Sequence, residues 1–435
     1  MRGVFRRTLF PLFLILSCPP TAMLMWYTLD RLDGSISALA TLFSTRGVTG
    51  VFQDVWGPVL FGSGTAWAII GIFAAFELVL VRVLPGREHH GPVTQSGHVP
   101  VYRANGPLSF AITLALFVGL SDLGLGLFRA SIIYRHFGEI LGALNLSSLG
   151  FCLLLYLKGR FAPSTADSGT SGNPVFDYYW GTELFPRVLG WDVKRFTNCR
   201  FAMMGWPLIV ISFAAAQNEL HGLHPGMAVA VALQLVYVAK FFWWETGYLG
   251  SLDIMHDRAG FYIVWGVLVW LPSVYTSHTL YLVDHPSNLG VFGAVVVFTL
   301  GTLAIFANYF ADAQRQRVRE TDGDTKVWGR KPVIVVGHYT TSNGEARENL
   351  LLASGFWGIA RHFHYVPEIL GAVFWTLPVA FTANPVLLPW FYVVFLTVLL
   401  THRALRDDER CRVKYGKDWD AYCKLVPYRI LPGVF

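Results

Sequence analysis

Long apolar stretches alternate with short polar ones along almost the whole chain. Each stretch approaches the roughly 20 residues that an α-helix needs to cross the hydrocarbon core of a bilayer. The stretch 260–283 contains Pro272, and the last two stretches are short and close together, so these segments are also compatible with re-entrant or protein-buried structure. The pattern predicts nine or ten membrane spans, near residues 8–28, 59–84, 108–127, 139–157, 203–220, 226–248, 260–283, 288–310, 365–382 and 384–402.

The polar stretches predict very little β structure. Residues 333–349 alternate apolar and polar side chains around Ser342-Asn343-Gly344, a pattern typical of a β-hairpin. The loop 159–176 is rich in Ser, Thr, Gly and Pro and is expected to be a flexible connection. We therefore expect an all-α polytopic membrane protein with about ten transmembrane helices and one small hairpin.

Composition supports a membrane protein. Charged residues make up 14% of the 435 residues and hydrophobic ones 54%, whereas a typical soluble domain carries about 25% charge. The net charge of +6 is explained by basic cytoplasmic loops, so a nucleic-acid partner is not required. The five cysteines are scattered without a CxxC pair, which favours neither a disulfide framework nor a zinc site.

The positions of Lys and Arg predict the topology. They gather before the first span, between the fourth and fifth, and after the eighth. With ten spans these loops and the C-terminal tail share one side of the membrane, which the positive-inside tendency identifies as the cytoplasm. The basic, then apolar N-terminus lacks a clear cleavage site and is expected to be a retained first span rather than a signal peptide.

No glycine-rich nucleotide motif is present, neither GxGxxG after a strand nor GxxxxGK[ST]. A bound nucleotide would therefore need its phosphates met by cationic side chains. Two clusters are candidates, Arg315 with Arg319, and the group at 403–410, which has aromatic residues nearby to stack a base. The competing interpretation of both is ordinary positive-inside anchoring. His362 and His364 lie two apart and are not expected to form a metal site.

Residues 241–262 carry three carboxylic acids and a histidine between two apolar spans. Ionisable groups at membrane depth are costly and usually face a partner or a cavity. In a continuous helix Glu245, Asp253 and His256 would share roughly one face. Either these groups and Asp257 supply a proton for chemistry inside the bilayer, or they form a structural ion-pair knot with Arg258.

The tail resembles the C-terminal signature of the NADPH-dependent sterol reductases, through His402-Arg403-x-x-Arg406-Asp407, Cys411 and Lys414-Tyr415-Gly416. The stretches GFWGIARHFHYVPEIL, WWETGYLGSLDIMHDRAGFY, VWGRKP and GTELFPRVLGWDVKRFTNCRFAMM are similar to the 7-dehydrocholesterol reductase branch, especially its plant-like members. Phe185 departs from the Asn of many sterol reductases but fits this branch. The resemblance runs from about Leu84 to the C-terminus.

The resemblance implies an NADPH pocket among the last helices and the tail. The basic pair after the eighth span would contact the 2′-phosphate side of the cofactor. The positions that match cofactor contacts of the family are Arg315, Arg319, Trp357, His364, Arg403, Asp407, Cys411 and Tyr415. The expected division is an N-terminal part, 1–200, with transmembrane helices and a cytoplasmic loop, and a catalytic part, 201–435, with the NADPH and sterol pockets.

The resemblance also implies reduction of the C7–C8 double bond of Δ5,7 sterols, with proton addition leading or accompanying hydride transfer. The candidate acids are Glu245, Asp253, His256, Asp257 and Tyr262. The sterol is expected to enter from the bilayer and NADPH from the cytoplasm, in the endoplasmic reticulum of a eukaryote or the inner membrane of a bacterium. Other sterol-synthesis enzymes are conceivable partners. The alternatives are a Δ14-, Δ24- or Δ24(28)-reductase and a sterol-binding protein without turnover; a transporter is disfavoured because no inverted repeat is evident.

Overall fold

The apolar stretches form long helices. The computed structural model describes residues 2–94, 96–340 and 344–435. Within these residues seven helices are long and apolar enough to cross a membrane, and each lies on a predicted span. They are Phe5–Arg31, Gly64–Val83, Phe137–Phe161, Arg195–His221, Pro225–Trp243, Val291–Glu320 and Leu388–Tyr415. The protein is accordingly a mostly helical, multi-pass membrane protein.

The other three predicted spans are shorter or broken. The first, near 108–127, is α5 (Gly106–Leu120), and the second, near 365–382, is α16 (Tyr365–Thr376) followed by the 3₁₀ turn η4 (Leu377–Phe381). The third, near 260–283, is the π-helix η3 (Phe261–Tyr275) followed by α13 (Ser277–Asp284). Pro272 lies inside η3, where its missing N–H excludes a regular ladder of hydrogen bonds. The count of about ten spans and the side of the tail stay predictions.

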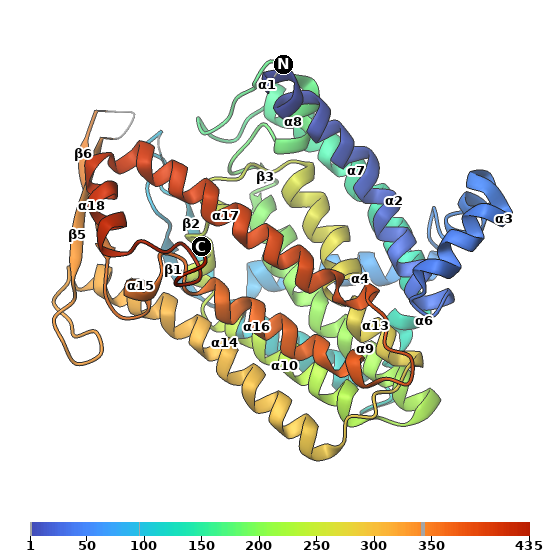
Figure 1. Ribbon diagram of the computed structural model, residues 1–435. Helices are drawn as coiled ribbons and strands as arrows, with labels where there is room; N and C mark the ends of the chain where they lie inside the picture. The colour runs from blue at the N-terminus through green and yellow to red at the C-terminus, as the bar shows by residue number, and fades with distance from the viewer. Residues whose placement is uncertain (1, 95, 341–343) are drawn as a thin grey trace. The chain divides into compact units, whose positions relative to one another are not determined.

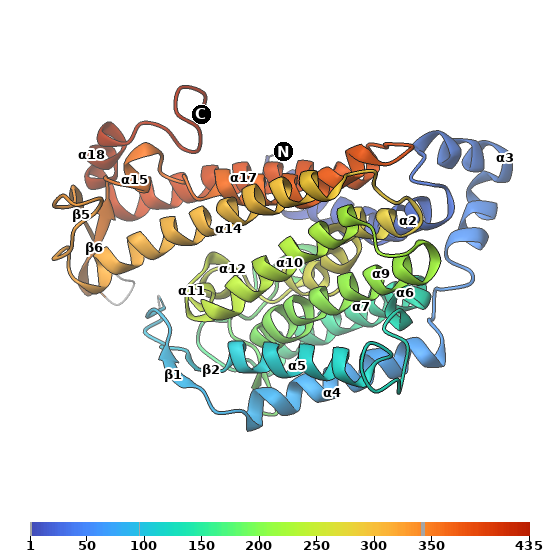
Figure 2. The same ribbon diagram turned by 90° about the horizontal axis from the view of Figure 1, so that it is seen from below.

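The chain divides into two compact units, here called the large unit and the tail unit. The large unit comprises residues up to Gly290 together with Pro378–Pro389. In both views most of its long helices lie alongside one another, with α9 packed against α10, whereas α3 stands apart from them at one end (Figures 1 and 2). Its other helices are α1 (Arg2–Val4), η1 (Phe5–Leu9), α2 (Phe10–Arg31), α3 (Ile36–Val55), α4 (Gly64–Val83), α6 (Ile132–Arg135), α7 (Phe137–Phe161), α8 (Pro174–Trp180), η2 (Arg195–Ala202), α9 (Met203–His221), α10 (Pro225–Trp243), α11 (Glu245–Leu249) and α12 (Leu252–Met255).

Side-chain caps fix where several of these helices begin. The Ser63 hydroxyl accepts the backbone N–H of Ala66 at 3.2 Å at the start of α4. The Asn173 side chain accepts two N–H groups at the start of α8, from Val175 at 3.1 Å and Phe176 at 3.2 Å. Such caps satisfy N–H groups that the first turn of a helix leaves unpaired. The Ser/Thr/Gly/Pro-rich loop before α8 therefore ends at a defined helix start.

The tail unit comprises Val291–Leu377 and Trp390–Phe435. Its long helices α14 (Val291–Glu320) and α17 (Phe391–Tyr415) both pack against α16 (Figures 1 and 2). The remaining helices are α15 (Phe356–Ile359), α18 (Lys417–Leu425) and the 3₁₀ turn η5 (Leu388–Trp390). Only the last residue of η5, Trp390, belongs to the tail unit. Because α14 and α17 continue without a break into polar sequence, the basic residues near their C-terminal ends are held on rigid helices.

The predicted hairpin is confirmed, but the expectation that it is the only sheet is wrong. Strand β5 (Ile334–Thr340) pairs antiparallel with β6 (Ala346–Leu352), with Ile334 opposite Leu352. The predicted turn includes residues 341–343, which lie outside the described residues. Two further antiparallel pairs belong to the large unit: β1 (Arg87–His90) with β2 (Val101–Ala104), and β3 (Arg187–Val188) with β4 (Trp191–Asp192). These strands are too short to give a clear alternating pattern.

Candidate functional site

The acidic segment after α10 is not one helix. The chain forms the short helices α11 and α12, with Gly250 and Ser251 between them. The expectation that helical spacing places Glu245, Asp253 and His256 on one face is therefore wrong. Each candidate acid has to be judged from its own surroundings.

Glu245 is buried in a network of cations. Its Oε1 lies 2.6 Å from Arg200 Nη2 and 3.7 Å from Arg195 Nε, and both arginines are buried as well. Its Oε2 accepts the backbone N–H of Gly106 at 2.8 Å. Both arginines also donate to Asn105 Oδ1, each at 2.9 Å. This carboxylate is thus held by charge-assisted bonds to residues from distant parts of the chain, an arrangement suited to holding helices together.

His256 and Asp257 form a pair at the end of α12. His256 Nδ1 lies 3.1 Å from Asp257 Oδ1. The Asp257 side chain is 1% exposed and the His256 side chain 46% exposed. Arg258, their ion-pair partner in one of the two alternative interpretations, donates to the carbonyl oxygen of Gly169 at 2.6 Å. The pair therefore joins a buried carboxyl to an imidazole that solvent or a ligand can reach.

Lys194 fixes the backbone that carries this pair. Its ammonium group, buried in the protein, donates to the carbonyl oxygens of Ile254 at 2.7 Å and Asp257 at 2.6 Å. Burial lowers the pKa of Lys194 to about 8, and the carboxylates of Asp192, Asp257 and Asp253 oppose that shift. Sequence reasoning treated Lys194 only as a loop cation, because its partners are 60 and 63 residues away.

Aromatic rings border the same segment. The Tyr262 ring stacks on Trp180 at a centroid distance of 5.7 Å, and Trp180 meets His256 edge-on at 6.4 Å. A close backbone approach makes this possible: Gly181 has φ +98°, and a Cβ there would lie 2.5 Å from the Ala259 carbonyl carbon. Only glycine tolerates both conditions. His256, Asp257 and Tyr262 are thereby gathered near α8, whereas Glu245 is held by other partners.

Phe185, the residue that departs from the common sterol reductase pattern, is part of the core here. It is buried with Tyr102, Leu249 and Ile254, and the Lys194 ammonium lies 5.6 Å from its ring centroid. It therefore packs against α11 and α12. This apolar contact has no need of the hydrogen bonds that an Asn would require.

In the tail unit, Arg315 and Trp357 form the centre of the predicted cofactor group. The Arg315 guanidinium lies 3.9 Å from the Trp357 ring centroid, a cation–π contact. Trp357 Nε1 donates to the Ala311 carbonyl oxygen at 2.6 Å, and its ring lies 5.0 Å from that of His364. Helix α14 thus carries Arg315 and positions Trp357. It also positions His364, because the Asn308 side chain of α14 donates to the His364 carbonyl oxygen at 3.0 Å.

Four of the predicted cofactor residues share one face of α17. Arg403, Asp407, Cys411 and Tyr415 are spaced four apart, which aligns side chains along a helix. The Cys411 sulfur lies 3.8 Å from Asp407 Oδ2. The Tyr415 hydroxyl accepts from Asn349 of β6 at 3.0 Å.

The two groups converge within the tail unit. Arg319 interacts electrostatically with Arg315, Tyr415 and Cys411, and its Nε donates weakly to the carbonyl oxygen of Leu350 at 3.4 Å. Tyr365 in turn interacts with Arg403 and Arg315. The structure therefore brings the predicted cofactor residues of α14 and α17 into one cationic and aromatic cluster, here called the cation cluster.

His362 borders this cluster and was not predicted as a site residue. Its buried ring stacks on Tyr365 at 5.2 Å, and its Nε2 lies 3.9 Å from Asp407 Oδ2. Burial lowers the pKa of His362 to about 3, so it is neutral near pH 7. No group of three or more His, Cys, Asp or Glu that could hold a metal occurs among the described residues.

Asp408 is adjacent to Asp407, one of the predicted cofactor residues, but its contacts are structural. It lies 3.0 Å from Arg429 Nη2 and 3.5 Å from Arg361 Nη2, and it accepts from Trp419 Nε1 at 3.2 Å. Adjacent residues of a helix point in different directions, so Asp408 ties the C-terminal segment to α17 while Asp407 faces the cation cluster.

Comparison with known proteins identifies the family of the chain. The model of the ergosterol biosynthesis ERG4/ERG24 family matches residues 16–435. The chain belongs to this family. The match begins well before Leu84, where the resemblance seen in the sequence alone starts.

Three relatives in the family are informative. The chain is 50% identical over 427 residues to 7-dehydrocholesterol reductase of Arabidopsis thaliana, covering 98% of this chain and 96% of that protein. It is 37% identical over 397 residues to 7-dehydrocholesterol reductase of Xenopus laevis, covering 88% and 83%. It is 35% identical over 430 residues to Delta(14)-sterol reductase of Methylotuvimicrobium alcaliphilum, covering 98% and 94%.

Proposed function

We propose that this chain reduces the C7–C8 double bond of Δ5,7 sterols, as in the conversion of 7-dehydrocholesterol to cholesterol, with NADPH as reductant. The observation that carries this proposal is the 50% identity over 98% of the chain to a 7-dehydrocholesterol reductase. The enzyme class is an oxidoreductase of sterol biosynthesis. The same relation supports a plant-like member of the family.

The cation cluster supports binding of an anionic nucleotide. Arg315 and Arg319 are both cations and oppose one another electrostatically, which an anionic ligand would relieve. The partner of Arg319 given above is a backbone carbonyl rather than a carboxylate. The residues that would hold NADPH are Arg315, Arg319, Trp357, His364, Arg403, Asp407, Cys411 and Tyr415. When bound, NADPH would supply the hydride, and the 2′-phosphate would distinguish it from NADH through charge-assisted bonds.

The large unit would supply the proton. A ring-B diene is electron-rich and has no carbonyl to polarise, so protonation at C8 must lead or accompany addition of hydride at C7. Proton addition leaves positive charge at C7, allylic to the remaining double bond, and aromatic faces such as Trp180 and Tyr262 are suited to stabilise it. We assign the acid to the His256–Asp257 pair, with Tyr262 and Asp253 as neighbours. Glu245 is the weakest candidate, because its charge is already matched by Arg200.

One assay tests the proposed function. Detergent-solubilised protein is incubated with 7-dehydrocholesterol and NADPH, loss of diene absorbance is followed, and the product is identified. We expect cholesterol. No conversion, with NADPH binding verified separately, would contradict Δ7 reduction and leave the cofactor assignment standing. Absence of NADPH binding would instead favour a sterol-binding protein without turnover.

A second candidate is Δ14 reduction, favoured by the 35% identity to a Delta(14)-sterol reductase over 98% of this chain. The same assay with a Δ8,14 sterol separates the two activities, because each product is distinct.

The proposed substrate is a membrane solute, so we expect entry from the bilayer and NADPH from the cytoplasm. The expected location is the endoplasmic reticulum in a eukaryote or the inner membrane in a bacterium, where other sterol-synthesis enzymes are conceivable neighbours.

A further inference from the structure

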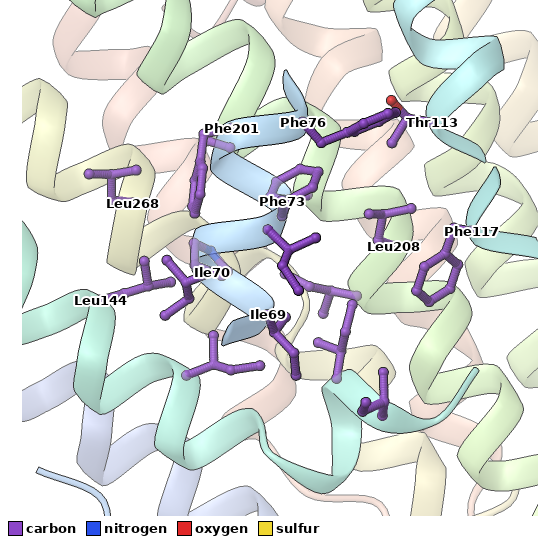
Figure 3. Close-up of a pocket in the computed structure, with 18 of the residues that line it drawn as sticks. Ile69, Ile70, Phe73, Phe76, Thr113, Phe117, Leu144, Phe201, Leu208 and Leu268 are labelled. Atoms are coloured by element: carbon purple, nitrogen blue, oxygen red, sulfur yellow. The ribbon is translucent and has the colours of Figure 1, made fainter. Parts of the chain in front are cut away.

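An apolar pocket of about 470 Å³ lies among the helices of the large unit (Figure 3). Small-molecule sites typically enclose roughly 300–1,000 Å³. Its walls come from α4, α5, α6, α7, η2, α9 and η3, together with Phe128. None of the candidate acids of the segment 245–262 lines it. It is therefore a cavity that the proposed reaction does not use.

The pocket has a single polar group in its lining side chains. Thr113 is the one lining residue whose side chain carries an oxygen or nitrogen. Figure 3 shows Thr113 beside Phe76 at one end, away from apolar residues such as Leu144. Thr113 Oγ1 donates to Glu77 Oε1 at 2.6 Å, and Ser109 Oγ lies 3.4 Å from Glu77 Oε2. A fully buried carboxyl thus stands directly behind the only hydroxyl of the pocket.

Glu77 needs an explanation, because an ionisable group within a membrane-spanning helix is costly and commonly marks a functional site. Its hydrogen-bond partners are neutral hydroxyls rather than a cation. Arg200, the cation that acts on it electrostatically, is paired directly with Glu245 at 2.6 Å. Since Thr113 donates its own hydrogen to Glu77, its oxygen keeps lone pairs that can accept a hydrogen from a ligand hydroxyl.

We infer that this pocket binds a sterol, with the sterol hydroxyl donating to Thr113 and the ring system filling the apolar walls. A sterol combines a rigid apolar body with one hydroxyl at one end, as the pocket combines apolar walls with one polar end. A phospholipid or a fatty acid would bring an anionic group to a polar end whose hydrogen-bonding groups are hydroxyls and a carboxyl rather than a cation, and burying a charge without a cationic partner is costly. The site is separate from the candidate acids and does not rest on the proposed reductase activity.

Photolabelling tests the site directly. The probe is a cholesterol analogue with a diazirine in ring B and a free hydroxyl, irradiated with the detergent-solubilised full chain and mapped by peptide mass spectrometry. We expect label within residues 69–76 and 201–209, reduced by excess cholesterol but not by phosphatidylcholine. Label confined to other segments, or equal competition by phosphatidylcholine, would overturn the inference.

Two pairs of variants sharpen the test. Thr113→Val should lower labelling about five-fold, the size expected for one lost hydrogen bond, whereas Thr113→Ser should retain it. A Cβ at Gly205 would lie 3.6 Å from Phe73, an ordinary contact. Gly205→Ala should therefore label normally and Gly205→Phe, which fills the cavity, should not.

Equal labelling within the Thr113 pair would overturn the role of the hydroxyl, and this pair still decides the matter if Gly205→Phe fails to fold. Reduction of 7-dehydrocholesterol should be unchanged in Thr113→Val. If labelling and reduction were lost together, the pocket would be part of the substrate site and the inference of a separate site would fail. If the wild type labelled as expected without reducing the sterol, the proposed function would fail and this site would stand.

Discussion

Two groups of charged residues, one in each unit, use charge in different ways. In the large unit, the Glu245 carboxylate is matched by two arginines and a backbone N–H, so its charge is consumed within the protein. In the tail unit, Arg315 and Arg319 repel one another; the Arg315 guanidinium lies on the Trp357 ring and pairs with Asp312 at 2.9 Å, and the partner given for Arg319 is a backbone carbonyl. The contrast teaches that a buried charge with a complete set of partners holds structure, whereas cations gathered together are suited to an anionic ligand.

The largest effect is expected for Asp257→Asn. If the His256–Asp257 pair is the acid, turnover should fall by roughly 10²- to 10⁴-fold, the usual contribution of general acid catalysis, while NADPH binding is retained. The measurement is kcat with 7-dehydrocholesterol alongside the Kd for NADPH. Asp253→Asn, which removes the candidate carboxylate four residues earlier on α12, is measured in parallel. Retained activity in Asp257→Asn would transfer the role to a neighbour.

Glu245→Gln separates structure from catalysis in the same unit. The change leaves Arg200 buried without its anion, and breaking a buried ion pair typically costs about 3–5 kcal/mol. We expect a large fall in thermal stability in detergent, measured by fluorescence-detected size exclusion. If the variant folds with normal stability but cannot reduce sterol, Glu245 is not a structural charge and becomes a candidate for the catalytic acid.

Arg319→Ala tests the cation cluster. Loss of a charge-assisted bond to the 2′-phosphate, worth about 1.5–3 kcal/mol, should weaken NADPH roughly 10- to 100-fold and NADH very little. Titration calorimetry with both nucleotides gives the ratio. Arg317→Ala is the matched control, since Arg317 lies on the same helix two residues away and so points in another direction. An equal loss of affinity for NADPH and NADH would contradict a contact between Arg319 and the 2′-phosphate.

The smallest effect concerns the exposed surface of the tail unit. Asp418 Oδ2 lies 2.9 Å from His338 Nδ1 and accepts the His338 backbone N–H at 2.9 Å. The hydrogen bond to Asp418 raises the pKa of His338, and the bonds to the His338 backbone and ring lower the pKa of Asp418. A raised histidine pKa stabilises the folded state at pH values below the unfolded pKa, and that contribution is lost as pH rises through the folded pKa.

Protection of the His338 amide against hydrogen exchange, corrected for intrinsic rate, should therefore fall slightly as pH rises from about 6 to 8, around the ordinary histidine pKa. The variant Asp418→Asn should weaken this dependence and leave only the part that comes from Glu348, whose Oε1 lies 3.4 Å from His338 Nε2. An undiminished dependence in that variant would show that Asp418 is not responsible.

Local patterns carried much of the prediction. Hydropathy placed the seven long helices, and alternation of apolar and polar residues placed the hairpin of β5 and β6. The resemblance of the tail to the sterol reductases was enough to group Arg403, Asp407, Cys411 and Tyr415. These signals are readable because each depends on residues within a few turns of one another.

The surroundings of individual charges could not be predicted in this way. Glu245 meets Arg200 from 45 residues away and Gly106 from 139 residues away, and nothing in the local sequence indicates either partner. The contacts at the break between α11 and α12 are also distant in sequence: Phe185 packs against Leu249 and Ile254 on either side of it, and Lys194 donates to the Ile254 carbonyl oxygen. A continuous helix would place Glu245, Asp253 and His256 on one face, but the structure divides this segment into α11 and α12.

The sequence by itself determined the membrane class, the long helices and the family, because hydropathy, periodicity and extended motifs are local properties; the residues expected to meet a nucleotide stay a prediction. Only the tertiary structure decided which charges are satisfied internally. It separated Glu245 from the His256–Asp257 pair, gave Lys194 its place beneath that pair, and set Thr113 and Glu77 at the end of an apolar pocket. The physical reason is that a charge or hydroxyl acquires its role from partners that approach through folding, at distances that sequence separation does not encode.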